Sequence, residues 1–453
     1  MFKKITNACV KFVQNYMPDP FLFCIMLTFM LFIFGMMFTS QSPLGMIVHW
    51  NEGFWGLLSF AMQMALVLVL GHTLASAKAF KNGLTFLAKI PKTPTGAIIM
   101  VTVVSSIACI INWGFGLVIG ALFAKELAKE VKGVDYRLLI ASAYTGFLLW
   151  HGGFSGSIPL LLASGGESVF DATAGIIGME GIPINETIFS RVNLVIMAVL
   201  FVTLPFLNAA MHPTKDKVVT IDKELLKDGA EFKELAKGDM SPADRLENSS
   251  VITMLIVAMG FTYIVYFFIT YGFNLNLDIV NFIFLFLGLA FHKTPKRFLH
   301  ALSGAVKGAG PIMLQFPFYA GIMGMMSGVN ADGVSLAILI SDFFVQISTT
   351  VTFPVLSFLS AGIVNIPVPS GGGQWVLQAP IMIPAGVELG IEPARTALTI
   401  VWGEVWTNMI QPFWALPALG IAGLGAKDIM GFCIIVLMYT GAIIALALTL
   451  FGI

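Results

Sequence analysis

The amino-acid sequence predicts an all-α polytopic membrane protein made of two inverted repeats, each with a re-entrant helical hairpin and a broken transmembrane helix. Of its 453 residues, 57% are hydrophobic and only 11% are charged. The mean hydropathy is +0.88, and such a composition is typical of helical membrane proteins. The 25 basic residues balance 25 acidic residues, so the net charge gives no indication of nucleic-acid binding.

Nine apolar runs are predicted to be transmembrane segments, which need roughly 20 residues each. They lie at 20–39, 54–76, 139–164, 192–211, 251–271, 278–292, 310–328, 395–422 and 429–452. The run 278–292 is short by itself and is expected to begin a turn earlier. Two further runs, 95–124 and 350–383, each contain two apolar arms separated by a break. Two crossings with a turn would need about 40 residues, so each of these runs is predicted to enter and leave the membrane on one side.

The basic residues predict the orientation of the chain. With the N-terminus in the cytoplasm, 23 of the 25 Lys and Arg residues fall in cytoplasmic segments, as the positive-inside rule requires. Seven of them lie in the charged stretch 212–250, which we interpret as a cytoplasmic linker. The linker follows a first repeat, 1–211, with an N-terminal amphipathic segment. A connecting transmembrane helix, 251–271, then inverts the second repeat, 272–453.

Matching features indicate that the two halves are repeats. Gln63 lies 49 residues before Asn112 at the first hairpin tip, and Gln315 lies 50 residues before Asn365 at the second. After each hairpin comes an apolar run that polar, Gly or Pro residues interrupt, and an uninterrupted run then closes each half. Inverted repeats with broken helices at matching positions are typical of secondary transporters whose site lies near the bilayer midplane. The two predicted breaks are 150–159 and 406–412.

Polar residues and glycines at the two tips and the two breaks are the candidate substrate-binding residues. A helix that begins at a tip or a break directs free N–H groups and the positive end of its dipole at the cavity, where a carboxylate can bind. Glycine lets the backbone approach the solute closely. For any single Asn or Ser, packing between helices is the alternative. The candidates are Asn112, Gly114, Gly116, His151, Gly152, Gly153, Ser155, Ser157, Asn365, Ser370, Gly371, Gly372, Gly373, Gln374, Thr407, Asn408 and Gln411.

His151 and Glu404 are the ionisable residues deepest in the predicted spans, which makes both candidates for cation coupling. Histidine titrates near neutral pH, so His151 could carry a proton; the alternative is that its ring bonds a freed backbone carbonyl. Unwound carbonyls could also hold a small cation, although no metal ligands are assigned and no cofactor is expected. Neither predicted hairpin contains Lys or Arg, which favours a small monocarboxylate over a phosphate or a dicarboxylate.

Other classes of function are also weighed. His151 and Ser155 lie four residues apart, as a base and a serine nucleophile can, but two glycines interrupt that turn and no acidic residue lies nearby to complete a triad. An enzyme is therefore not expected. A channel is not expected either, because a pore seldom needs two pseudo-symmetric hairpins. A carrier of the same architecture for another organic anion or an amino acid stays open as the alternative.

Four stretches of the chain resemble the short-chain fatty acid transporter family, and the resemblance extends over essentially the whole chain. They are YMPDPF at Tyr16–Phe21, INWGFGL at Ile111–Leu117, WHGGFSGSIPL at Trp150–Leu160 and PSGGGQWVLQAPIM at Pro369–Met382. The resemblance implies uptake of acetoacetate or butyrate across the bacterial inner membrane. The wider ion transporter superfamily implies coupling to Na⁺ or H⁺, a homodimer in the lipid membrane and elevator-type alternating access. Its sodium-coupled members carry a Ser-Asn-Thr string at the hairpin tips, which this chain lacks.

Overall fold

The computed structural model describes residues 2–16, 19–56, 58–173, 175–220, 240–272 and 276–451, and within these ranges every regular element is a helix. The all-α prediction is confirmed. In the first half the helices are α1 (Phe2–Tyr16), α2 (Pro20–Phe38), α3 (Pro43–Phe54), α4 (Leu58–Ser76), α5 (Lys78–Ala88), α6 (Pro94–Ile111), α7 (Trp113–Glu130), α8 (Tyr136–Thr145), η1 (Gly146–Leu149), α9 (Ser157–Ser164), α10 (Glu167–Ala172), α11 (Arg191–Ala210) and η2 (Lys215–Lys217).

The second half continues the chain with a similar order of elements. Its helices are α13 (Pro242–Glu247), α14 (Ser250–Tyr271), α15 (Leu277–His292), α16 (Pro295–Ala305), η4 (Val306–Ala309), α17 (Gly310–Ser327), α18 (Leu336–Gln346), α19 (Phe353–Asn365), α20 (Gly371–Glu388), α21 (Pro393–Thr407), η5 (Asn408–Ile410), α22 (Pro412–Ala422) and α23 (Ala426–Phe451). In each half a hairpin (α6–α7, α19–α20) precedes a broken helix and a long closing helix. The inverted symmetry and the boundaries of the repeats stay predictions.

Many helices begin at a polar residue followed by proline. Asp19 precedes Pro20 at the start of α2, Thr93 precedes Pro94 at α6, and in both cases the side chain accepts a backbone N–H of the first turn. A side-chain acceptor satisfies one of the N–H groups that lack a partner inside the helix. Proline suits this position because it has no N–H to satisfy and its φ angle is already helical.

Both predicted hairpins are present and both are longer than predicted. Asn112 alone separates α6 from α7: its backbone is extended, and its side chain accepts the N–H of Phe115 as the cap of α7. In the second hairpin residues 366–370 separate α19 from α20. The second helix of each hairpin continues beyond the predicted end, to Glu130 in α7 and to Glu388 in α20. The residues after each apolar run are more polar, but they remain helical. Entry and exit on one side of the membrane stays a prediction.

Both predicted breaks are also present. Residues 150–156 form turns between η1 and α9, and the second break is narrower, with η5 and Gln411 between α21 and α22. Gly152 and Gly153 open the first break, whereas Pro412 closes the second. A proline has no N–H for a bond to the preceding turn, which disfavours the continuation of α21 through Pro412.

The length and apolar character of a helix indicate whether it can cross a membrane. Within the described part of the chain, five helices are long and apolar enough to cross a membrane, or six if α4 and α5, which meet at a bend of 82°, count as one. Four of the five match predicted runs, and the fifth is α6. Of the remaining predicted runs, 139–164 and 395–422 are broken at the sites above, and 278–292 forms the shorter α15 with 16 residues. The runs 54–76 and 310–328 form α4 and α17, with 19 and 18 residues.

The helix α3 was not predicted from the sequence, and α4 begins four residues later than the predicted run. The predicted run 54–76 begins where α3 ends, and a turn at Trp55 and Gly56 separates the two helices. Apolar residues continue through that turn, so hydropathy alone does not reveal it. The predicted linker, 212–250, contains η2 and α13, while its residues 221–239 lie outside the described ranges.

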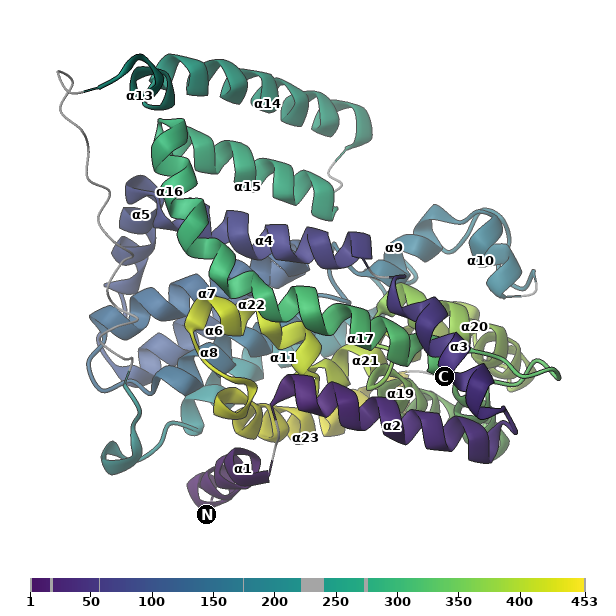
Figure 1. Cartoon of the computed structure of the whole chain (residues 1–453). Coiled ribbons are helices and arrows are strands. Elements are labelled where there is room, and N and C mark those ends of the chain that lie inside the picture. Colours follow the sequence, from purple (N-terminus) through teal and green to yellow (C-terminus); the bar gives the residue numbers. More distant parts are fainter. Residues whose placement is uncertain are drawn as a thin grey trace.

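The helices form a broad bundle in which α17, α21 and α22 lie between the outer helices α14 and α1 (Figure 1). The connecting helix α14 lies at one edge of the molecule against α15, which in turn packs on α4. On the opposite side α1 packs along α23. Between these edges, one buried apolar cluster extends through both halves, from Val10 in α1 to Leu448 in α23. The polar residues of the breaks are therefore enclosed by packed apolar side chains.

Candidate functional site

A hydrogen bond between His151 and Glu404 joins the two broken helices. The Nδ1 atom of His151 in the first break lies 2.7 Å from Oε2 of Glu404 in α21, 253 positions further along the chain. Both side chains are completely buried. Removing one partner from such a buried pair costs about 3–5 kcal/mol, because it strands the other in a medium of low polarity. The pair therefore ties the two halves together.

The surroundings of His151 indicate which ring nitrogen carries the proton. Its Nε2 lies 3.2 Å from the backbone nitrogen of Ile158, and a backbone N–H can only donate. Nε2 is therefore an acceptor, and in the neutral ring the proton is on Nδ1, where it is donated to Glu404. The hydroxyl of Ser157 lies 3.1 Å from the same Nε2. His151 thus orients the first turn of α9 at one edge of its ring and the carboxylate at the other.

The second hairpin tip lies directly on this pair. A side-chain carbon built on Gly371, the first residue of α20, would collide with the hydroxyl of Ser157 and with the ring of His151. Only glycine allows this approach. The same construction on Gly372 meets nothing within 4 Å, so this residue of the first turn faces open space. The N-termini of α9 and α20 therefore converge beside His151.

A second set of hydrogen bonds connects the tip of the second hairpin to the second break. The amide nitrogen of Asn365 donates to Oδ1 of Asn408 at 2.7 Å and to the hydroxyl of Thr407 at 3.0 Å. Asn408 in turn donates to Oε1 of Glu404 at 3.2 Å. A continuous buried chain of polar contacts thus runs from Asn365 through Asn408 and Glu404 to His151.

Two further contacts fix the second break. Thr407 donates its hydroxyl proton to the carbonyl of Gly362 in α19 at 2.8 Å. The amide nitrogen of Gln411 donates to the carbonyl of Ile366 just after α19. Both carbonyls lie at the C-terminal end of α19, where backbone acceptors have no partner inside the helix. Asn365 at the second tip and Thr407, Asn408 and Gln411 in the second break are thus joined by direct hydrogen bonds of the tip region to the break.

The first tip contacts the first break in a similar way. The backbone N–H of Trp113 donates to the hydroxyl of Ser155 at 3.0 Å, and that of Phe154 donates to the carbonyl of Ile110 at 2.8 Å. The backbone of Ile110 also fills the space that a side chain on Gly153 would need. Ser155 and Asn112 thus both accept backbone N–H groups from the first turn of α7, which belongs to the same half of the chain.

Several candidate residues serve packing in this conformation. The space beside Gly116 is filled by Cys109 of α6, and the space beside Gly152 by Asn193 and Met197 of α11. Gly114 is buried in the first turn of α7. Ser370 caps α20 by accepting the N–H of Gly373 at 3.3 Å, and Gln374 donates to the carbonyl of Ala361 and to Gln378.

Three residues that sequence reasoning missed also hold the breaks. The hydroxyl of Tyr144 in α8 donates to the backbone carbonyl of Asn408. Asn193 in α11 donates to the carbonyl of Gly152 at 2.9 Å and accepts the indole N–H of Trp402 at 3.1 Å. A tyrosine and an asparagine inside apolar runs are the sequence signals that could have pointed to them, because such residues need buried partners.

The expectation that no acidic residue orients His151 was wrong. Ser157, His151 and Glu404 have the order of contacts of a serine–histidine–acid triad. The serine is Ser157 rather than Ser155, and the acid comes from the other half of the chain, which sequence distance concealed. Two features oppose nucleophilic chemistry: the N–H of Ile158 also occupies Nε2, and Gly371 lies against the Ser157 hydroxyl.

Comparison with known proteins places the whole chain in one family. The model of the family described as "Short chain fatty acid transporter" matches residues 1–451. A protein of Escherichia coli (strain K12) is 46% identical over 451 residues, which is 100% of both chains. A protein of Haemophilus influenzae (strain ATCC 51907 / DSM 11121 / KW20 / Rd) is 42% identical over 449 residues, or 99% of both. Both carry the name "Putative short-chain fatty acid transporter".

Two solved structures show distant similarity. The YdaH transporter of Alcanivorax borkumensis matches with a TM-score of 0.41 and 14% identity over 95% of this chain and 98% of its own. MtrF of Neisseria gonorrhoeae matches with a TM-score of 0.40 and 15% identity over 98% and 97%. The full-length family match and the close relatives decide the classification. With its several apolar helices, the chain is a multi-pass membrane protein, and it belongs to the short-chain fatty acid transporter family.

Proposed function

We propose that this protein is a secondary active carrier of short-chain monocarboxylates such as acetoacetate and butyrate. In this proposal it works as a homodimer in the bacterial inner membrane, with its N-terminus in the cytoplasm and elevator-type alternating access. A proton is the coupling cation. The domains are those of the repeat scheme: 1–211, the linker 212–250, the connecting helix 251–271, and 272–453.

The observation that carries the proposal is the meeting of two helix N-termini at His151. The first-turn N–H groups of α20, at Gly371 and Gly372, have no partner inside the helix, and Gly372 faces open space. Ser157, the first residue of α9, lies on the opposite side, with its hydroxyl 3.1 Å from Nε2 of His151. Backbone N–H groups and two positive dipole ends together form a site for one carboxylate.

The charge balance favours coupling to a proton. A helix N-terminus stabilises an anion by about 0.3–2 kcal/mol, which is small beside the cost of bringing a second negative charge close to the buried carboxylate of Glu404. Protonation of the His151–Glu404 pair removes that repulsion. In our proposal the substrate anion therefore binds together with a proton on this pair, and both are released on the other side.

Sodium is the alternative coupling ion, and one observation favours it. Oδ1 of Asn365 and Oε1 of Gln374 are buried near the second tip, and neither has a hydrogen-bond partner among the described residues. Such carbonyl oxygens are suitable ligands for a hard cation. A proton-coupled carrier needs a pH gradient for accumulation, whereas a sodium-coupled carrier needs a sodium gradient. One experiment that varies the two gradients separately therefore distinguishes the two mechanisms.

Uptake by the purified protein in proteoliposomes tests the proposal. Labelled acetoacetate and butyrate are presented with a pH gradient alone, a sodium gradient alone, or neither. Protein-free liposomes are the necessary control, because undissociated butyric acid crosses a bilayer unaided. We expect saturable, pH-gradient-driven accumulation and faster uptake when unlabelled acid is present inside.

The outcomes separate the classes of function. No protein-dependent uptake of either acid under any gradient would refute the proposed substrate. Competition by an amino acid or a different organic anion, without competition by butyrate, would identify the alternative carrier. Conductance that neither saturates nor responds to acid on the opposite side is the signature of a channel. Mass measurement of the protein in nanodiscs tests the homodimer.

A further inference from the structure

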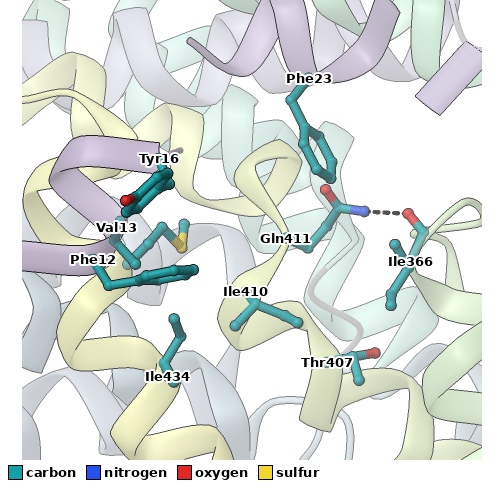
Figure 2. Close-up of a pocket in the computed structure, with 10 residues that line it drawn as sticks. Phe12, Val13, Tyr16, Phe23, Ile366, Thr407, Ile410, Gln411 and Ile434 are labelled. Carbon is teal, nitrogen blue, oxygen red and sulfur yellow. Dashed lines mark hydrogen bonds between the residues drawn. The ribbon is translucent and has the colours of Figure 1, made fainter. Parts of the chain in front are cut away.

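A cavity of about 350 Å³ lies beside the second break, and Thr407 and Gln411 of the candidate site form its inner end. Its walls come from α1, α2, α23 and the break itself (Figure 2). Apolar side chains such as Phe23, Ile410 and Ile434 make up most of the wall. At its outer end lie Phe12 and Tyr16 of α1, which are 58% and 74% exposed. The cavity thus leads from the surface beside α1 to the centre of the protein.

The polar groups at the inner end of the cavity are few and uncharged. They are the hydroxyl of Thr407 and the amide of Gln411, whose nitrogen is bonded to the carbonyl of Ile366 (Figure 2). The amide oxygen of Gln411 points away from that carbonyl, on the side of Phe23. Its contact with the N–H of Phe413 is long, at 3.5 Å. This oxygen can therefore accept a further hydrogen bond.

The cavity is continuous with the candidate site. Thr407 lines it and also accepts the amide N–H of Asn365 at 3.0 Å, so the inner wall is the end of the polar chain that leads through Asn408 to Glu404. None of the lining residues, all within the described part of the chain, is charged. An anion would have no counter-charge there, whereas a neutral acid with an apolar tail would match both the walls and the single amide oxygen.

We propose that this cavity binds the undissociated form of a short- to medium-chain monocarboxylic acid. The carboxyl O–H donates to Oε1 of Gln411, and the alkyl chain lies between Ile410, Ile434 and Phe23. The inference rests on the proposed function and deepens it, because it names the neutral acid as a bound species and assigns the chain-length preference to these apolar residues.

The volume of the cavity sets the expected chain length. A water molecule takes about 30 Å³ of the liquid, so the cavity has room for roughly a dozen non-hydrogen atoms. Hexanoic acid has eight such atoms and acetic acid four, so acetic acid leaves most of the apolar wall uncovered. Each methylene group buried against that wall stabilises binding by about 0.8 kcal/mol, which is roughly fourfold in affinity.

Competition with a series of acids tests the proposal. Unlabelled acids from acetic to octanoic compete with labelled butyrate for uptake into proteoliposomes at pH 5.5. For the natural chain we expect the inhibition constant to fall about fourfold per added methylene up to hexanoic acid. Ile434→Trp fills the cavity, so in this variant the gain should stop at or before butyric acid. Met438→Trp, on the same helix but 67% exposed, is the matched control and should keep the natural profile.

Binding of hexanoic acid to the detergent-solubilised protein, measured by calorimetry, separates this inference from the proposed function. If no variant takes up any acid, the transport proposal fails, but binding that Ile434→Trp abolishes and Met438→Trp preserves still supports the cavity. An unchanged chain-length profile in an active Ile434→Trp variant overturns the inference. So does mass-spectrometric detection of a phospholipid that Ile434→Trp displaces while the binding of acids stays the same.

Discussion

Oε2 of Glu404 accepts a hydrogen bond of 2.7 Å from Nδ1 of His151, while Oε1 of the same carboxylate accepts one from Asn408 at 3.2 Å. One buried carboxylate thus connects the first break to the second and, through Asn408, to the tip of the second hairpin. In the proposed function this pair carries the coupling proton, and the bonds of Glu404 would then relate that proton to contacts of both halves. This is the arrangement that a carrier needs if cation binding is to affect a movement of one part against another.

Replacing Glu404 by glutamine should separate proton-driven accumulation from exchange. The amide keeps an acceptor oxygen for His151 and the size of the side chain, but it cannot take up a proton. We expect accumulation driven by a pH gradient to fall by at least about tenfold, or ~1.4 kcal/mol. Exchange of labelled for unlabelled butyrate should stay within about twofold of the natural chain, because exchange requires no return of an unprotonated carrier.

The control for this experiment is Glu392→Gln, in which an exposed glutamate just before α21 loses its charge. It should leave both accumulation and exchange unchanged. Natural levels of pH-driven accumulation in Glu404→Gln would exclude the pair as the proton carrier. The sodium alternative, with its unpartnered oxygens at Asn365 and Gln374, would then be favoured.

Adding one methyl group at the second tip should have different results at two neighbouring positions. Gly371→Ala places a methyl group against Ser157 and His151, and overpacking of this kind typically costs about 1–3 kcal/mol. Gly372→Ala meets open space. We therefore expect the maximal rate of butyrate uptake to fall by about tenfold or more in Gly371→Ala, because the second tip is displaced. Gly372→Ala leaves the tip in place but adds its methyl group to the open space of the proposed site, so it should raise the KM and keep the maximal rate within about twofold. An unchanged KM in Gly372→Ala would contradict the proposed carboxylate site.

The positions of the tips and breaks could be predicted from the sequence because they depend on local chemistry. Pro412 and the pair Gly152–Gly153 both disfavour a continuous helix, and hydropathy shows that these residues lie within apolar runs. Proline alone is not sufficient, because α11 and α17 continue through Pro205 and Pro317. The pairing of His151 with Glu404 could not be predicted in this way. It depends on how helices 253 positions apart pack, and no local rule relates the two residues.

The role of glycines was predicted less well than their positions. Gly116 and Gly371 look alike in the sequence, as glycines at a hairpin tip, yet the first packs against Cys109 within its own hairpin and the second against His151 of the other half. Packing between helices, which the sequence suggested only for a single Asn or Ser, is thus the role of Gly116. Only tertiary structure distinguishes a glycine that admits a neighbouring helix from one that lies beside a binding site.

Ser157 should contribute to affinity and not to covalent chemistry. Ser157→Ala removes one hydrogen bond to Nε2 of His151, which the N–H of Ile158 keeps occupied. A net loss of about 1 kcal/mol is typical for such a bond, so we expect roughly a fivefold higher KM for butyrate at an unchanged maximal rate. A fluorophosphonate probe should not label the protein. Labelling that disappears in Ser157→Ala would instead identify an enzyme with the Ser157–His151–Glu404 triad.

The last prediction concerns the end of the cytoplasmic linker. The Lys296 ammonium, 2.7 Å from Asp244 and 2.9 Å from Glu247, links α16 to α13. The hydrogen bond from Lys296, with a smaller contribution from Ser241, lowers the pKa of Asp244 to about 2. The ordinary value is 3.8, so the contribution of this contact is complete above that pH and is lost only as the pH falls through about 2. The two carboxylates also raise the pKa of Lys296, which keeps it charged at every pH below its ordinary 10.5.

We therefore expect α13 to stay docked, with no change between pH 5 and pH 8. Trypsin cleavage after Arg245, quantified by mass spectrometry on the protein in nanodiscs at pH 8, reports the docking because the bond lies within α13. Lys296→Met should raise the cleavage rate several-fold, since two carboxylates lose their shared cation. Lys307→Met removes one positive charge eleven positions further on and should leave the rate unchanged. Equal rates in the natural chain and in Lys296→Met would show that packing, and not this ion pair, holds the end of the linker.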